Sequence, residues 1–174
     1  MKRAKYILTF ILSIVGFVGC QYGEYDRIPS AAVRIEFGNA AMWSAYGVAA
    51  YPDHKEFIKN ENKPRGFTYV ANSYTGYGGV LLLCDPVNTV RAYDLSCPVE
   101  RSMKVRVKVD DEELVLRCNE CGSTYDISTG SPLSGPAADN RYFLQAYAVY
   151  FNPMGGVLIT RKYKMGVNRK HLIV

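Results

Sequence analysis

The chain has 174 residues, of which 48% are hydrophobic and 13% aromatic, and its formal net charge is +5. This length is enough for one domain with its own hydrophobic core. Three of the cations, Lys2, Arg3 and Lys5, belong to an N-terminal segment that we expect to be removed, which lowers the net charge to about +2. The charge therefore gives no support to a nucleic-acid partner.

The first twenty residues have the charged start, short apolar middle and small-residue end of an export signal. The apolar run 6–18 is too short to span a bilayer comfortably. Phe17-Val18-Gly19-Cys20 resembles the bacterial lipoprotein box, in which cleavage precedes a cysteine that is then lipidated. We therefore expect a signal peptide over 1–19 and a lipidated N-terminus with its tether over 20–30.

Acyl chains on Cys20 would hold the protein at a membrane without any spanning helix. The localisation expected from this segment is the bacterial cell envelope, with the outer membrane as the anchoring site and an envelope protein or a redox partner as neighbour. Residues 161–174 form a basic C-terminal tail.

Residues 31–160 are rich in Tyr, Val, Gly and Pro and show no long amphipathic helical pattern, which favours an all-β domain. Alternation of apolar and polar residues, or apolar runs between turn residues, predicts several strands. They are 33–37, 67–70, 80–84, 89–94, 103–109, 113–117, 142–151 and 156–160, with a further possible strand over 47–51. Within 53–63 we expect a short helical turn around Phe57 and Ile58.

Two of these strand pairs are expected to be hairpins, with turns at Asp85-Pro86-Val87-Asn88 and at Asp110-Asp111-Glu112. The second hairpin should return Cys118 to the level of about Lys104, close to the loop that holds Cys97. The run Cys118-Asn119-Glu120-Cys121-Gly122 points two thiols toward one centre, which is typical of a metal site or a disulfide. We therefore expect Cys97, Cys118 and Cys121 to meet at one tip.

The remaining candidate ligands fit this tip less well. Cys84 is predicted to be a buried, inert thiol, because the strand geometry places it on the order of 25 Å from Cys97. The two histidines, His54 and His171, lie among polar and charged residues and are predicted to be surface side chains. Glu100 is the nearest residue that could supply a fourth ligand.

The run 118–126, together with Thr129-Gly130 and Gly135-Pro136-Ala137, resembles the second cluster-binding loop and the proline loop of Rieske iron-sulfur proteins. In that family the first loop reads Cys-x-His and the second reads Cys-x-x-His-Gly-Ser-x-Tyr-Asp. Cys97 and Cys118 match the two cysteine ligands, whereas Val99 and Cys121 stand at the two histidine positions. The resemblance extends over roughly 67–160.

This resemblance implies a Rieske-like antiparallel β-sandwich over 31–160, with a small tip, similar to rubredoxin and zinc ribbons, that carries the two cysteine loops. It also implies that Ser123 and Tyr125 donate hydrogen bonds to sulfur atoms of the site. Gly135 and Pro136 would shape the neighbouring loop.

Four states of the tip stay open from the sequence. They are a disulfide, most naturally between Cys97 and Cys118, a zinc ion held by three thiolates with Glu100 or water, a [2Fe-2S] cluster with modified ligands, and free thiols. The ordinary Rieske ligand set is incomplete, because a valine offers no lone pair at position 99.

The sequence contains no Gly-x-Ser-x-Gly elbow, no His-Glu-x-x-His and no phosphate loop, so we do not expect an enzyme. The expected function is a membrane-anchored, non-catalytic binding or structural module whose tip is stapled by a disulfide or a metal. The alternative is an electron-transfer protein that carries a [2Fe-2S] cluster with modified ligands.

Overall fold

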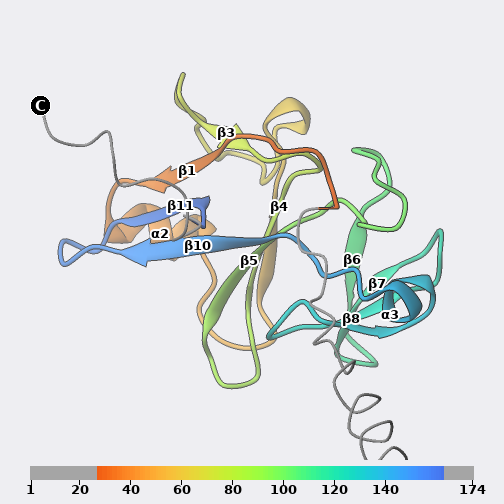
Figure 1. Ribbon diagram of the computed structural model, residues 1–174. Coiled ribbons are helices and arrows are strands. Elements are labelled where there is room, and N and C mark those ends of the chain that lie inside the picture. The colour runs from red at the N-terminus through yellow and green to blue at the C-terminus, as the bar shows by residue number, and fades with distance from the viewer. Residues whose placement is uncertain (1–26, 163–174) are drawn as a thin grey trace, which may run out of the picture.

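The computed structural model describes residues 27–162, which form two antiparallel sheets and two short helices (Figure 1). The larger sheet has seven strands in the order β2-β4-β5-β10-β11-β1-β3. In that order they span His54–Phe57, Val80–Cys84, Val90–Asp94, Ala146–Phe151, Val157–Arg161, Val33–Phe37 and Tyr74–Thr75. The expected all-β class is confirmed.

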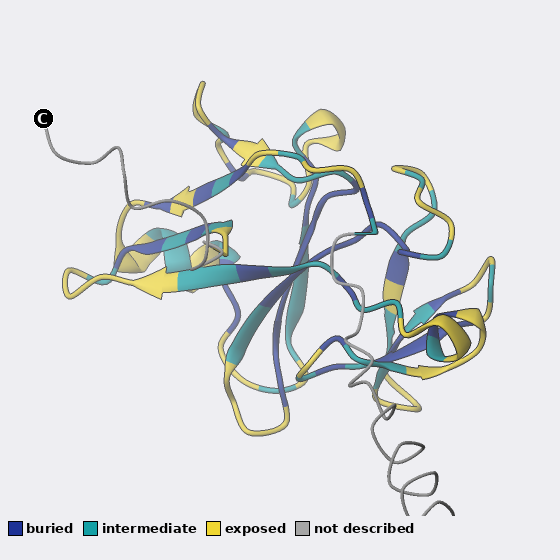
Figure 2. Ribbon diagram, viewed as in Figure 1, coloured by how far each residue is buried: buried dark blue, intermediate teal, exposed yellow. Residues whose placement is uncertain are grey.

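The large sheet curls so that its two ends enclose an aromatic core. The strands β1 and β2 stand far apart in the strand order, yet the rings of Phe37 and Phe57 are only 5.6 Å apart. Phe67 joins them at 5.5 and 5.2 Å, with edge-to-face or tilted geometry that favours aromatic packing. Strand β4, between β2 and β5, is buried along its whole length (Figure 2). We call the buried cluster around Phe37, Phe57 and Phe67 the aromatic core.

The smaller sheet has four strands in the order β6-β7-β8-β9, and its core packs against the opposite face of β4, since Leu81 and Leu83 belong to it whereas Val80 and Leu82 belong to the aromatic core. The strands span Val107–Asp110, Val115–Cys118, Thr124–Asp126 and Pro132–Ser134, and helix α3 follows over Pro136–Asn140. Leu81, Tyr93 and Leu95 of the large sheet contact Leu116 and Tyr125 of the small one in a single cluster. This second cluster also contains Cys97 and Cys118, and we call it the cysteine core.

The strands expected over 33–37 and 80–84 occur with those limits, and 89–94 is shortened by one residue. The expected strand over 103–109 is wrong in its first half, since β6 begins at Val107 and pairs that residue, not Lys104, with Cys118. The preceding segment instead pairs with the residues that follow β5, through Cys97 N to Val105 O at 3.1 Å and an isolated bridge between Ser96 and Arg106.

Three further expectations are wrong for a common reason, namely that tertiary contacts outweigh local pattern. The segment 67–70 is a loop whose backbone bonds locally, and the rings of Phe67 and Tyr69 anchor it on the aromatic core. The segment 47–51 is not a strand, and a helix, α2 (Ala40–Tyr46), precedes it with Asn39 as its N-cap. Residues 54–57 pair with β4 as strand β2, and within 53–63 only Lys59–Glu61 is helical.

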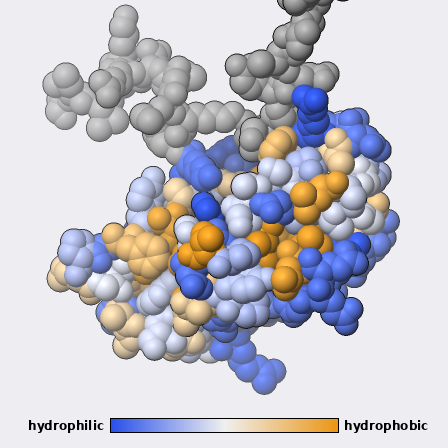
Figure 3. Space-filling view, turned by 90° about the horizontal axis from the view of Figure 1, so that it is seen from below, coloured by the Kyte–Doolittle hydropathy of each residue, from blue (hydrophilic) through white to orange (hydrophobic). Residues whose placement is uncertain are grey.

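Neither of the α-helices between residues 27 and 162 is long and apolar enough to cross a membrane. The signal peptide, Cys20 and almost all of the basic tail lie outside the described residues. The surface seen from below the view of Figure 1 carries separate hydrophobic areas between hydrophilic ones (Figure 3).

The turn between β4 and β5 depends on the carboxylate of Asp85, which generates the first prediction. This buried group accepts hydrogen bonds from the N–H groups of Val87 and Thr89 and from Nε of Arg91, at 3.1, 2.8 and 2.9 Å. Asp85→Ala should lower the free energy of unfolding by about 1–3 kcal/mol, as measured by urea denaturation. Asp111→Ala, at an exposed turn position, should change it by less than about 0.5 kcal/mol.

The same substitution should have a pH-dependent effect. Burial opposes ionisation of Asp85, but the N–H of Thr89 and the guanidinium of Arg91 outweigh it and hold the pKa below its ordinary value. A carboxyl group whose pKa is lower in the folded than in the unfolded protein stabilises the fold at pH values above its unfolded pKa of about 3.9. This stabilisation is lost as the pH falls through the pKa of the folded state. The gap between wild type and Asp85→Ala should therefore shrink below about pH 4, and a gap that widened there would contradict this account.

Candidate metal site

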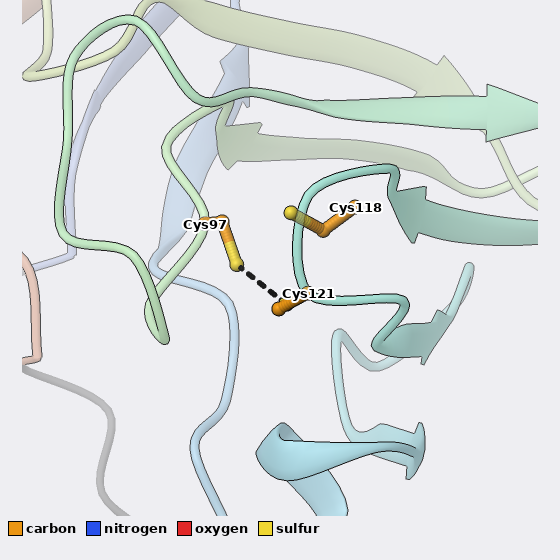
Figure 4. A group of neighbouring side chains, drawn as sticks. All are labelled: Cys97, Cys118 and Cys121. Atoms are coloured by element: carbon orange, nitrogen blue, oxygen red, sulfur yellow. Dashed lines mark hydrogen bonds between the residues drawn. The ribbon is translucent and has the colours of Figure 1, made fainter.

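Three cysteines from two separate loops converge at the junction between the sheets (Figure 4). Cys97 follows β5 of the large sheet, and Cys118 ends β7 of the small sheet. The chain then turns tightly, with Gly122 N bonded to Cys118 O at 2.9 Å, and this turn carries Cys121 back toward the other two. Gly122 has φ = 70°, a left-handed conformation that glycine adopts without strain. The expected convergence of the three thiols is confirmed.

The three Sγ atoms all lie within 4.8 Å of one another, and those of Cys97 and Cys121 are 3.7 Å apart. Cys97 and Cys118 are completely buried, whereas Cys121 is half-exposed. All three are free thiols, since a disulfide would require a separation of about 2.05 Å. The site is therefore a preassembled group of soft ligands that solvent reaches from the side of Cys121.

Hydroxyl groups of the two expected residues, Ser123 and Tyr125, contact two of the sulfurs, but Ser123 accepts a hydrogen bond where it was expected to donate one. Tyr125 Oη lies 3.5 Å from Cys97 Sγ, and the Cys121 thiol donates to Ser123 Oγ at 3.2 Å. Ser123 Oγ also accepts the N–H of Ala137 at 3.1 Å, which ties the proline loop to the cysteine turn. Gly135 allows this approach because a Cβ on it would meet the backbone of Ser123 at 3.0 Å.

The surroundings of Cys97 favour the thiolate. A hydrogen bond from the Cys118 thiol outweighs burial and, with the N–H of Glu100 and the hydroxyl of Tyr125, lowers the pKa of Cys97 to about 5. The same hydrogen bond and burial raise the pKa of Cys118. Burial and the neighbouring sulfur also raise the pKa of Tyr125, so its hydroxyl keeps the proton that it donates. A metal ion would replace the proton shared between the two sulfurs.

Other candidate ligands stand apart from the three thiols. Glu100 is exposed, its carboxylate is not part of the group, and its contribution to Cys97 is its backbone N–H. Val99 packs its half-buried side chain on the cysteine core. Cys84 is buried in the aromatic core, as expected. His54 is half-buried in β2, outside this group, and His171 lies outside the described residues.

The carboxylate of Asp94, which sequence reasoning missed, holds the first cysteine loop in place. Its Oδ1 accepts the N–H groups of Gly78 and Ser96 at 2.9 and 2.8 Å. Its Oδ2 accepts the N–H of Tyr77 at 2.8 Å and the hydroxyl of Tyr147 at 2.5 Å. Burial raises the pKa of this carboxyl, and the four hydrogen bonds oppose that effect.

A sequence signal for this contact existed in the glycine-rich loop before β4. A Cβ on Gly78 would lie 2.5 Å from Ser96 N, and one on Gly76 would lie 2.6 Å from the Asp94 carboxylate. These glycines are therefore required for the loop to approach the strand that leads to Cys97. The sequence shows the glycines but not which carboxylate they approach.

No family model matches the chain, and no curated protein matches it either. Among solved structures, the chain is similar to the ferredoxin of carbazole 1,9a-dioxygenase from Nocardioides aromaticivorans IC177, at 15% identity over 75% of this chain and 99% of that one, with a TM-score of 0.42. A protein assigned as the small subunit of an NADH-dependent nitrite reductase from Mycobacterium tuberculosis is 14% identical over 82% of this chain and 93% of that one, with a TM-score of 0.35. At TM-scores this low, neither likeness decides the fold or the function of this chain.

The Asp94 contacts predict a positioning role that can be separated from simple folding. Asp94→Asn replaces one acceptor oxygen by an amide that faces donors, and should lower the free energy of unfolding by about 2–4 kcal/mol. It should also weaken the binding of cobalt, added as a test ion, at the three cysteines, because the loop after Ser96 loses the carboxylate that holds it in place. Tyr147→Phe removes only one of the four hydrogen bonds and should leave cobalt affinity within about threefold of wild type. Equal cobalt affinity in Asp94→Asn and wild type would refute the positioning role.

Proposed function

We propose that this chain is a bacterial envelope lipoprotein, anchored through Cys20, whose cysteine tip holds a single metal ion. The domain then acts as a non-catalytic binding or structural module with a metal-stapled tip. The observation that supports the metal is the meeting of three sulfur atoms within 4.8 Å of one another. A stapled disulfide would need two thiols, and the convergence of a third supports a metal.

The spacing of the sulfurs fits one four-coordinate ion. Two thiolates about 2.3 Å from a tetrahedral zinc ion lie about 3.8 Å apart, close to the 3.7 Å between Cys97 and Cys121. Three thiolates leave one coordination position, which water or the flexible carboxylate of Glu100 would fill. Zinc suits this donor set, since it accepts sulfur and oxygen ligands together. Bound there, it would tie the two sheets through Cys97 and Cys118.

An electron-transfer role is the second candidate, and the contacts of Tyr125 and Ser123 favour it. Hydroxyl groups beside ligand sulfurs raise the potential of an iron-sulfur cluster, and both hydroxyls lie beside sulfur here. The donor set does not fit the ordinary Rieske cluster, which needs two imidazoles, because Val99 has no donor atom and His54 is not in the group. A cluster would therefore require a fourth ligand from elsewhere.

Metal analysis of the full chain, purified without oxygen, separates these candidates. We expect one zinc or cobalt ion per chain and thiolate-to-cobalt absorption in the near ultraviolet. Cys118→Ser should weaken cobalt binding at least about tenfold, because it removes one of three thiolates. Cys84→Ala is the matched control and should leave the affinity unchanged, since Cys84 lies in the aromatic core.

Two other results would contradict the single-ion site. Two iron atoms and two sulfides per chain, lost in Cys118→Ser, would establish the electron carrier. A metal-free protein with a mass two protons below that of the reduced chain would establish a disulfide.

The resemblance of the loops to a Rieske site can be tested by restoring the missing imidazoles. Val99→His combined with Cys121→His should bind a [2Fe-2S] cluster on anaerobic reconstitution with iron and sulfide. Two neutral imidazole ligands should give a potential between about −150 and +300 mV, well above the value of about −400 mV for plant-type ferredoxins. Val99→Leu with Cys121→His lacks one imidazole and should bind none. If the double histidine variant also binds none, the loops share only their backbone shape with that family.

The lipid anchor is tested by Cys20→Ser, which removes the only group that the lipoprotein pathway can acylate. The wild-type chain should sediment with membranes and gain the mass of its acyl chains. The variant should keep its signal or appear without lipid, and should lose stable membrane attachment. Cys84→Ala should behave as wild type. Membrane attachment of Cys20→Ser that equals wild type would contradict the anchor.

A further inference from the structure

The two cores lie on opposite faces of β4, so the molecule has a cysteine end and an aromatic end with different properties. The cysteine core holds Cys97, Cys118 and, packed against it, Cys121. The aromatic core lies at the other end, where Trp43 packs between Phe37 and Phe151 with ring centroids 5.1 and 5.4 Å away. The β10–β11 turn beyond Phe151 is the most exposed apolar point there, with Met154 87% exposed.

The first described residues dock at the cysteine end. The guanidinium of Arg27 lies 4.1 Å from the centroid of the Tyr142 ring, a cation–π contact, and Ile28 next to it is buried. Tyr142 packs against the same core as Cys121 and Val99. Ser30 then contacts Arg161, and only after this contact does the chain enter β1.

A short series of hydrogen bonds joins this docking point to the sulfurs. Tyr142 N donates to Ala137 O at 2.9 Å, and Ala137 N donates to Ser123 Oγ at 3.1 Å. Ser123 Oγ in turn accepts the thiol of Cys121 at 3.2 Å. The place where the tether joins the domain is therefore within a few side chains of the candidate metal site.

The tether between Cys20 and Arg27 is short. Only residues 21–26 separate them, and a fully extended chain of that length reaches about 25 Å. The docking of Arg27 thus limits how far the cysteine end can move from the lipid, whereas the Met154 turn, at the other end of the domain, can move farther away.

We propose that the cysteine end of the domain faces the membrane to which Cys20 is attached, and that the aromatic end, with the Met154 turn, points away from it. This inference rests on the proposed lipid anchor. It assigns the surface around Cys121 and the exposed Leu133 as the one that meets the bilayer surface. Any exchange of metal or electrons at the half-exposed Cys121 then takes place next to the membrane.

Energy transfer from tryptophan to dansyl-labelled lipid headgroups in vesicles tests this orientation, because Trp43 is the one tryptophan of the chain and lies at the aromatic end. The reporter at the cysteine end is Leu133→Trp in a Trp43→Phe background. The matched reporter at the far end is Met154→Trp in the same background. With a tether of at most about 25 Å, we expect at least about twice the transfer efficiency at position 133 compared with 154 or with Trp43.

Lengthening the tether provides the second arm. Insertion of about 20 Gly and Ser residues between Gly23 and Glu24 should remove the difference between positions 133 and 154, because a flexible linker no longer restrains the orientation. Circular dichroism confirms that each variant is folded. Equal transfer at both positions in a chain whose mass shows the acyl groups would overturn the orientation while leaving the anchor intact. A chain without acyl groups would overturn both.

Discussion

The carboxylate of Asp94 is the contact on which the cysteine site depends. It receives four hydrogen bonds, from a glycine-rich loop, from the residue before Cys97 and from β10, so it joins three segments that are distant in sequence. Burying a carboxylate carries a large desolvation cost, which is tolerated only where hydrogen bonds satisfy its oxygens. The end of β5 is therefore held in position just before the chain reaches Cys97. The segment that leads into the small sheet is held at the same place, because Nε of Arg106, the residue before β6, donates to Gly78 O at 2.6 Å.

The site follows from the way two sheets meet. Each of the two cysteine loops begins where a strand ends, at β5 for Cys97 and at β7 for Cys118 and Cys121. Both strands pack on the common cysteine core. Thiols held by buried strands lose little conformational entropy when they bind a metal, because the protein has already ordered them. The half-exposed position of Cys121 leaves one side open for entry of an ion. Cys97 and Cys118 are buried because they lie at the ends of buried strands, whereas the tight turn at Gly122 leaves Cys121 accessible.

The residues at the two histidine positions of the resembling motif change the chemistry of the site. Imidazoles would extend the ligand set away from Cys97 and Cys118, and would suit a two-iron cluster. Cys121 instead brings its sulfur to 3.7 Å from Cys97, and Val99 contributes packing and a backbone N–H. The hydroxyls of Ser123 and Tyr125 still contact sulfur. The loops therefore place hydroxyl groups beside a group of three thiols.

The sequence alone determined the all-β class, four of the strands to within a residue, and the meeting of Cys97, Cys118 and Cys121, because alternation, turn residues and Cys-x-x-Cys spacing are local signals. It also separated Cys84 from the site correctly, since strand length fixes that distance. The tertiary structure alone decided the rest. It shifted the pairing of Cys118 from Lys104 to Val107, because residues 105–106 pair with residues 96–97, which follow β5. It turned 54–57 into a strand along β4, and it supplied the partners of Asp94. These features arise from contacts between segments far apart in the chain, whose energies no local pattern of residues records.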